Sequence, residues 1–179
     1  MRRLIAPGIA LLFVVTLAGT IACAGPSETE RNTPTLKELE AVEVKEYNGT
    51  DLSSIGDFRE NSIKGPQFID MDNYTLKVTG LVDTPLELAY TDVISDHQDY
   101  EKVVTLNCVE GWSVTILWEG VLVKDLIEEA GVSPDAKVVI FHAYDGYTTS
   151  LPLEYLEDND ILMAYKMNGV ALPPESFEG

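Results

Sequence analysis

The run from Val103 to Ser113 constrains this chain most, because an apolar strand ends there in a polar, glycine-containing turn that carries a cysteine. Cys108 follows the β-branched part of the run, and Gly111 lies three residues further on. A thiolate at a strand end can reach a soft metal or an electrophile, whereas a thiol in mid-strand would be packed. Free cysteine also behaves as a small buried hydrophobe. The run predicts a strand that leads into either a ligand site or a packed thiol.

Several other segments have the composition of strands. The segment 74–82 alternates apolar and polar residues, as a half-buried strand does, and 137–143 is a continuous apolar run expected to be a buried strand. Residues 102–106, 114–118 and 148–151 are also predicted to be extended, with Asp145-Gly146 as a turn. Asn168-Gly169 separates 162–167 from 170–172 and is a strong hairpin signal.

Two segments are predicted to be helical. Residues 123–130 place apolar residues at helical spacing, and Gly131 follows where a left-handed cap belongs. A shorter helix is expected over 90–95. Strands outnumber helices, so the fold class is predicted to be α+β and mostly β, with a few short helices.

The first 23 residues have the layout of a secretory signal peptide. Arg2 and Arg3 precede an apolar run, and small residues lead to Cys23, as at a bacterial lipoprotein processing site. Cys23 would then be lipidated and would anchor the protein without spanning the membrane. Ala22-Cys23-Ala24 also fits ordinary signal cleavage, and the paired arginines fit twin-arginine export poorly. The chain is predicted to be exported, with a lipoprotein favoured over a soluble product of ordinary cleavage.

Residues 24–48 are rich in Ser, Thr, Pro, Glu and Lys and are predicted to be a disordered acidic tether. Within it, 36–44 is expected to form at most a transient helix, because its apolar stripe is narrow. Residues 49–179 then form one domain with a single core. With Cys23 lipidated or removed, Cys108 has no disulfide partner and stays available as a ligand.

The charge of the chain argues against nucleic-acid binding. Acidic residues number 30 against 12 basic ones, and loss of Arg2 and Arg3 leaves 30 against 10. Such a surface gains nothing from counterion release at phosphates and is repelled by an anionic bilayer. Solubility explains most of this charge.

Ordered blocks of sequence resemble one enzyme family. They are Asn61-Ser62-Ile63-Lys64-Gly65, Val78-Thr79-Gly80-Leu81-Val82, Thr105 to Ser113, Trp118 to Val121, Asp145-Gly146-Tyr147 and Asn168 to Pro174. Together they resemble the sulfite oxidase-type molybdopterin oxidoreductases, and most of all the bacterial branch with the periplasmic methionine sulfoxide reductase catalytic subunit. The resemblance covers about residues 58–179.

The resemblance implies a sulfite oxidase-type fold, a molybdenum-pyranopterin cofactor and a metal ligand at Cys108. Pterin-held molybdenum has room for one soft, anionic protein ligand, which a thiolate supplies. The residues that would contact the cofactor are Asn61, Lys64 and Gly65. Lys64 would pair with the phosphate group of the cofactor. Ala143 stands where this branch has threonine, so that contact is missing or comes from neighbouring backbone. Ser176 lies near a further polar contact of the family.

Other nearby residues have structural or supporting interpretations. Glu110 is expected to accept hydrogen bonds that fix the cysteine turn, and Trp112 to shield the site from water. Trp118 is expected to be a core residue. His142 has two interpretations, a donor to cofactor or substrate and a structural histidine, whereas His97 in a polar loop needs no role. The family continues beyond the Pro173-Pro174 segment, so the domain is expected to be incomplete at its C-terminus.

The predicted function is two-electron oxygen-atom transfer on the outer face of the cell membrane or in the periplasm. Sulfite oxidation calls for clustered arginines, and none follows Cys108, so a sulfoxide-like substrate is favoured. Electrons would come from a separate membrane or periplasmic partner, because the chain has no covalent haem motif. The alternatives are a non-enzymatic lipoprotein binding module and a reactive-thiol redox protein.

Overall fold

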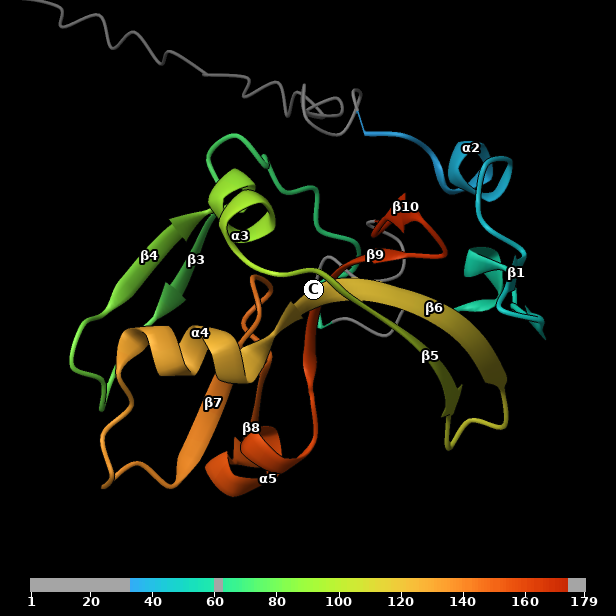
Figure 1. The fold of residues 1–179 in the computed structure, drawn as a ribbon. Coiled ribbons are helices and arrows are strands. Elements are labelled where there is room, and N and C mark those ends of the chain that lie inside the picture. The colour runs from blue at the N-terminus through green and yellow to red at the C-terminus, as the bar shows by residue number, and fades with distance from the viewer. Residues whose placement is uncertain (1–32, 60–62, 174–179) are drawn as a thin grey trace, which may run out of the picture.

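The computed structural model describes residues 33–59 and 63–173, and Figure 1 shows how their elements are arranged. The N-terminal part holds α2 (Leu36–Glu40), β1 (Glu46–Tyr47), β2 (Thr50–Asp51) and the 3₁₀ helix η1 (Ile55–Asp57). It is followed by β3 (Thr75–Val78), β4 (Leu86–Ala89), α3 (Tyr90–Asp96), β5 (Tyr100–Asn107) and β6 (Ser113–Leu122). The last elements are α4 (Val123–Ala130), β7 (Val138–His142), β8 (Thr148–Pro152), α5 (Leu153–Asp158), β9 (Leu162–Met167) and β10 (Val170–Ala171).

A four-stranded antiparallel sheet forms the centre of the fold, in the order β10-β9-β6-β5. Strand β6 lies between β5 and β9 and is buried along most of its length. Figure 1 shows β5 and β6 as one long curved hairpin. Three two-stranded antiparallel ribbons, β1-β2, β3-β4 and β7-β8, complete the strands. The predicted class, α+β and mostly β with short helices, is what the structure shows.

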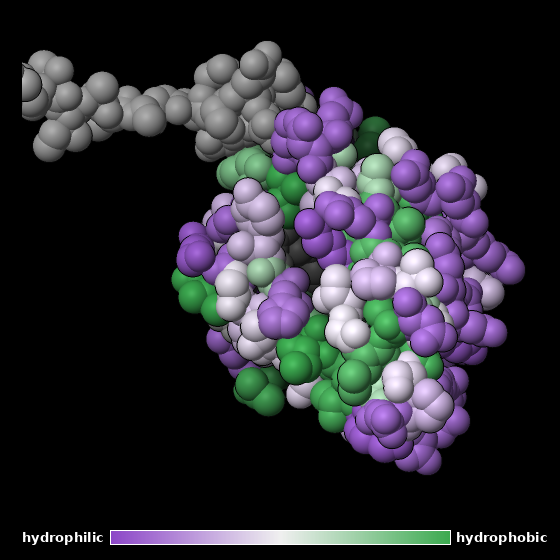
Figure 2. All heavy atoms as spheres, turned by 90° about the vertical axis from the view of Figure 1, so that its left-hand side faces the viewer, coloured by the Kyte–Doolittle hydropathy of each residue, from purple (hydrophilic) through white to green (hydrophobic). Residues whose placement is uncertain are grey.

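The core divides into three clusters around this sheet. The first joins residues of β6 and β9 to the N-terminal part, the second joins α3 and β3-β4 to β6 and β9, and the third joins α4 and α5 to β7-β8. Trp118 is 9% exposed in the first cluster, which confirms its predicted core position. Figure 2 shows hydrophilic side chains over much of the face formed by the left-hand side of Figure 1, with smaller hydrophobic groups between them.

The two predicted helices and the last hairpin are confirmed. Helix α4 covers 123–130 and Gly131 ends it with φ +67, while α3 covers 90–96. Asn168 and Gly169 have φ of +47 and +77, as the turn between β9 and β10 requires. Among the described residues, no helix is long and apolar enough to cross a membrane.

The prediction of a disordered tether is wrong for residues 33–48. Thr35 and Glu38 form a capping box that starts α2, and Leu39 is buried in the first core cluster. Glu43 is also buried, and its carboxylate accepts hydrogen bonds from the Ile55 N–H (2.8 Å), the Ser54 hydroxyl (2.7 Å) and the Asn168 amide (3.1 Å). The narrow apolar stripe of this segment is enough to dock it, because the hydrogen bonds of Glu43 add to the burial of Leu39. Residues 1–32, including Cys23, lie outside the described residues.

The prediction of a buried strand over 137–143 also needs correction. In β7, Val138 is 54% and Ile140 59% exposed, so only alternate side chains pack inward. A run of apolar residues does not distinguish a strand covered on both faces from one covered on a single face. In the described part of the chain β7 pairs with β8 alone, which makes it one half of a two-stranded ribbon.

Candidate functional site

Cys108 is the first residue of the turn that joins β5 to β6. Its N–H donates to the Trp112 carbonyl (2.9 Å), and its carbonyl accepts from the Gly111 N–H (3.0 Å). Gly111 has φ +90, so this is a three-residue hairpin loop that needs a glycine at its end. The thiol is free and partly exposed, and Val109 beside it is fully exposed. The sequence therefore folds so that the thiol stands at a strand end and is accessible, as predicted.

Two side chains of the same turn brace it. The indole N–H of Trp112 donates to the Glu110 carboxylate (3.3 Å). The Trp112 ring also packs edge-on against Phe58, with 5.2 Å between the ring centroids. Glu110 thus accepts a hydrogen bond within the turn, as expected from the sequence, and Trp112 ties the turn to the N-terminal part of the chain.

Lys64 and Gly65 lie beside the turn between β7 and β8. The Lys64 ammonium is 3.8 Å from the position that a Cβ on Gly146 would occupy. The Ile63 N–H donates to the Asp145 carboxylate (2.8 Å), so the segment that begins at Ile63 is fixed to this turn. Gly65 has φ +81, which favours glycine there, although a Cβ would meet nothing within 4 Å.

The β7–β8 turn repeats the geometry of the cysteine turn. The Ala143 N–H donates to the Tyr147 carbonyl (2.8 Å), its carbonyl accepts from the Gly146 N–H (3.1 Å), and Gly146 has φ +97. Ala143 therefore holds the same place in its loop as Cys108 does in the other. A methyl group offers no hydrogen bond, so a polar contact from position 143 itself must come from its backbone.

Asp145 is the residue that the sequence interpretation overlooked at this turn. It is 2% exposed, and its carboxylate accepts hydrogen bonds from the backbone N–H groups of Tyr147 (2.7 Å) and Ile63. These two N–H groups, and then the Lys64 charge, hold the pKa of Asp145 below its usual value despite burial. A buried carboxylate bonded 82 residues back along the chain could not be read from an Asp-Gly turn signal.

The two turns lie apart in Figure 1, and two residues that are close in the sequence contact one turn each. Phe58 packs against the cysteine turn, and Ile63 binds the turn that contains Asp145. Five residue steps separate Phe58 from Ile63, so their Cα atoms are at most roughly 18 Å apart.

The remaining predicted residues are distributed as follows. Asn61 and Ser176 lie outside the described residues. His142 is exposed in β7. His97 caps α3 and pairs with Glu129 (2.8 Å), so it has a structural partner that its loop position did not indicate. Among the described residues, no three or more His, Cys, Asp or Glu side chains are grouped to hold a metal ion.

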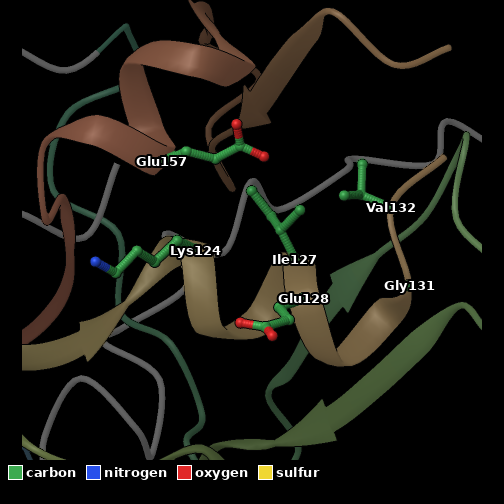
Figure 3. A pocket seen from close by; sticks show the side chains of 6 residues that line it. All are labelled: Lys124, Ile127, Glu128, Gly131, Val132 and Glu157. Carbon is green, nitrogen blue, oxygen red and sulfur yellow. The ribbon is translucent and has the colours of Figure 1, made fainter. Parts of the chain in front are cut away.

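A hollow between α4 and α5 is separate from these turns (Figure 3). It has a volume of about 520 Å³ and is lined by Lys124, Ile127, Glu128, Gly131, Val132 and Glu157. In Figure 3 the Ile127 side chain points toward α5, and the Lys124 ammonium points away from the hollow. Lys124 instead pairs with Asp160. None of the predicted site residues lines this hollow.

A family model for the oxidoreductase molybdopterin-binding domain matches residues 63–176. The chain belongs to this family. The match contains Lys64, Gly65, Cys108 and Ala143, which are the predicted cofactor residues that the structure describes, together with Asp145. It confirms the resemblance drawn from the ordered sequence blocks.

Curated relatives include two kinds of named reductase. The chain is 42% identical over 111 residues to the uncharacterized oxidoreductase YuiH of Bacillus subtilis, covering 62% of this chain and 56% of YuiH. It is 30% identical to a nitrate reductase [NADPH] of Fusarium oxysporum (59% of this chain, 15% of that protein). It is 27% identical to the protein-methionine-sulfoxide reductase catalytic subunit MsrP of Xanthomonas axonopodis pv. citri (65% and 36%). The chain matches about half of YuiH and smaller parts of the others.

A solved structure shows the same fold. The sulfane dehydrogenase SoxCD from Paracoccus pantotrophus superposes with a TM-score of 0.58 at 18% identity, over 93% of this chain and 49% of that one. The predicted sulfite oxidase-type fold is therefore confirmed.

The described residues fit a molybdopterin group. A metal that a cofactor already holds by sulfur needs one soft protein ligand, and the free, partly exposed Cys108 would provide it. The Lys64 ammonium near the Gly146 turn supplies a cation of the kind that binds phosphate.

Proposed function

We propose that the chain is the molybdopterin-binding part of an extracytoplasmic oxidoreductase that transfers an oxygen atom in a two-electron reaction. The observation that carries the proposal is the free, partly exposed Cys108 thiol at a hairpin turn inside the matched family domain. The contacts of Trp112 with Glu110 and Phe58 hold the turn in place, which supports a role for Cys108 as a fixed ligand. Its partial exposure supports the same role, because a cysteine that served only for packing would be buried.

The residues of the chain have distinct roles in this proposal. Cys108 holds the metal, while Lys64, Gly65 and the backbone of the Ala143 turn hold the rest of the cofactor. Asn61 and Ser176 make further polar contacts. When bound, the molybdenum-pyranopterin cofactor supplies the two-electron chemistry, and the protein supplies ligation, orientation and a shaped pocket. The Glu110–Trp112 hydrogen bond keeps the cysteine turn in one conformation.

A neutral oxygen donor such as a sulfoxide is the favoured substrate. Val109, Glu110 and Gly111 follow the ligand, so the turn offers no cation to a sulfite oxyanion. Arg59, beside Phe58, is the single arginine in the described part of the chain and does not form a cluster. The named activity of the MsrP relative agrees with this preference.

The electron source is a separate membrane or periplasmic protein, because the chain carries no covalent haem motif. Export follows from the signal-like first 23 residues, with lipidation at Cys23 as the proposed anchor. Fractionation of the producing cells and the mass of the mature N-terminus test both points. A diacylated N-terminal cysteine supports the anchor, whereas an unlipidated N-terminus contradicts it.

The deciding experiment measures molybdenum in the full chain purified from a host that makes the cofactor. We expect a molar ratio of molybdenum to protein near one in the wild type. Cys108→Ser should keep the fold but lose both the metal and sulfoxide reduction. The matched control is Ser113→Ala, which removes a hydroxyl at the first residue of β6, on the other side of the same turn. Folded wild-type protein without metal would instead support a binding module, and a low thiol pKa in such material would support a redox protein.

A further inference from the structure

We propose that Asp145 is a positioning residue of the molybdopterin site, which fixes Lys64 beside the β7–β8 turn. This inference rests on the proposed function and adds to it a residue that does not itself contact the cofactor. Its basis is the two backbone hydrogen bonds that the carboxylate accepts from different parts of the chain.

The first step is that Asp145 joins two segments that are far apart in the sequence. One carboxylate oxygen accepts from Tyr147, two residues away, which is a local turn contact. The other accepts from Ile63, 82 residues away, and crosses to the segment that carries Lys64 and Gly65. An Asp-Gly turn requires only the first contact, so the second is an additional function of this side chain.

The second step is that Asp145 is buried while the residues around it are exposed. Asp145 is 2% exposed, whereas the Ile63 and Tyr144 side chains are 62% and 70% exposed. The Ile63 side chain therefore contributes little apolar burial to hold its segment in place. The hydrogen bond to the buried carboxylate is the anchor, and removal of such an acceptor leaves two N–H groups without a partner.

The third step is electrostatic. Lys64 lies near Gly146, and its charge also acts on the Asp145 carboxylate. The carboxylate thus holds the Lys64 backbone through its neighbour Ile63 and attracts the Lys64 ammonium toward the turn. A cation placed in this way is available to an anionic group that sits over the turn amides.

The test uses Asp145→Ala and Asp145→Asn in the full chain, prepared with and without the cofactor. In cofactor-free protein, we expect tryptic cleavage after Lys64 to rise about tenfold in Asp145→Ala relative to the other lysines, because the anchor is lost. Asp145→Asn keeps one acceptor oxygen and should lie between the wild type and Asp145→Ala. In loaded protein, molybdenum retained after dialysis should fall in the same order.

The matched control is Glu43→Gln, which alters the other buried carboxylate that joins distant segments. Glu43→Gln should lower stability without faster cleavage after Lys64 or loss of metal. Unchanged cleavage after Lys64 in Asp145→Ala would overturn the inference. Faster cleavage with full metal retention would also overturn it, because Asp145 would then be structural only. A wild type that never binds molybdenum would instead refute the proposed function, and the inference with it.

Discussion

Phe58 packs edge-on against Trp112, with their ring centroids 5.2 Å apart, and so connects the N-terminal part of the chain to the turn that presents Cys108. Phe58 also meets Trp118 edge-on at 6.0 Å, which extends the contact into the first core cluster. The cysteine turn is therefore supported by the core through three aromatic rings. The turn that presents the candidate metal ligand is thus in contact with Phe58, which lies 50 positions before Cys108.

We expect Phe58→Ala to destabilise the protein by about 2 kcal/mol, because it removes a partly buried ring and two aromatic contacts. Denaturant unfolding followed by tryptophan fluorescence measures the effect. Phe58→Leu should recover more than half of the stability, and Tyr155→Ala, at an exposed aromatic, should change it little. Equal stability of Phe58→Ala and the wild type would show that the ring does not support the turn.

Acid should weaken the protein through Glu43. Burial alone would raise the pKa of Glu43, but hydrogen bonds from Lys45, Ile55, Ser54 and Asn168 outweigh it and lower the pKa below its usual 4.5. Because the pKa of Glu43 is lower in the folded protein, the ionised carboxylate contributes its full stabilisation above pH 4.5. This stabilisation is lost as the pH falls through the pKa that Glu43 has in the folded protein.

Glu43→Gln should therefore cost about 2 kcal/mol at pH 7 and flatten the loss of stability below pH 4.5. Unfolding curves at several pH values test this. Glu46→Gln, at an exposed neighbouring position, should leave both the stability and its pH dependence unchanged. The interpretation fails if wild type and Glu43→Gln lose stability in parallel as the solution is acidified.

The sequence predicted the parts of the fold that depend on local signals. Helix α4 with Gly131, the Asn168-Gly169 turn and the strand end at Cys108 each carry their own pattern within a few residues. The tether was mispredicted for a physical reason. Thr35-x-x-Glu38 is a capping signal, but the burial of Glu43 depends on Asn168, 125 residues later, which no local pattern reveals.

The candidate site shows the same division. Cys108 and Lys64 could be named from the ordered blocks that resemble the family, and the equivalence of the two hairpin loops became visible only from their hydrogen bonds. Asp145 was interpreted as a turn residue because half of its role, the contact to Tyr147, is local. The other half, the contact to Ile63, exists only after the β7–β8 turn meets the preceding segment.

His97 should make stability fall modestly as the pH rises above 6.5. Burial would lower the pKa of His97, but the hydrogen bond and charge of Glu129 outweigh it and raise the pKa above 6.5. The His97–Glu129 pair contributes its full stabilisation below pH 6.5 and loses it as the pH rises through the pKa that His97 has in the folded protein. Glu129 is 46% exposed, so solvent screens the pair and about 0.5 kcal/mol is expected.

Glu129→Gln tests this pair directly. It should remove the part of the pH dependence that begins above pH 6.5. Added salt should weaken the same pH dependence in the wild type, because salt screens the attraction between exposed charges. Glu128→Gln, one residue earlier in α4, is the control and should keep the wild-type slope. An unchanged slope in Glu129→Gln would assign the pH dependence to another group.

Gly111→Ala should separate the geometry of the cysteine turn from general stability. Gly111 has φ +90 and a Cβ there would meet nothing within 4 Å, so the cost is the backbone conformation alone, about 1–2 kcal/mol. Gly49 offers a matched control, because it has φ +79, equally open space and a place in the β1–β2 turn. Both alanine variants should lose similar stability in denaturant unfolding.

Only Gly111→Ala should also lose molybdenum on dialysis, because the Gly111 N–H holds the Cys108 carbonyl. Equal metal retention in the two variants would mean that the conformation of this turn does not control ligation by Cys108.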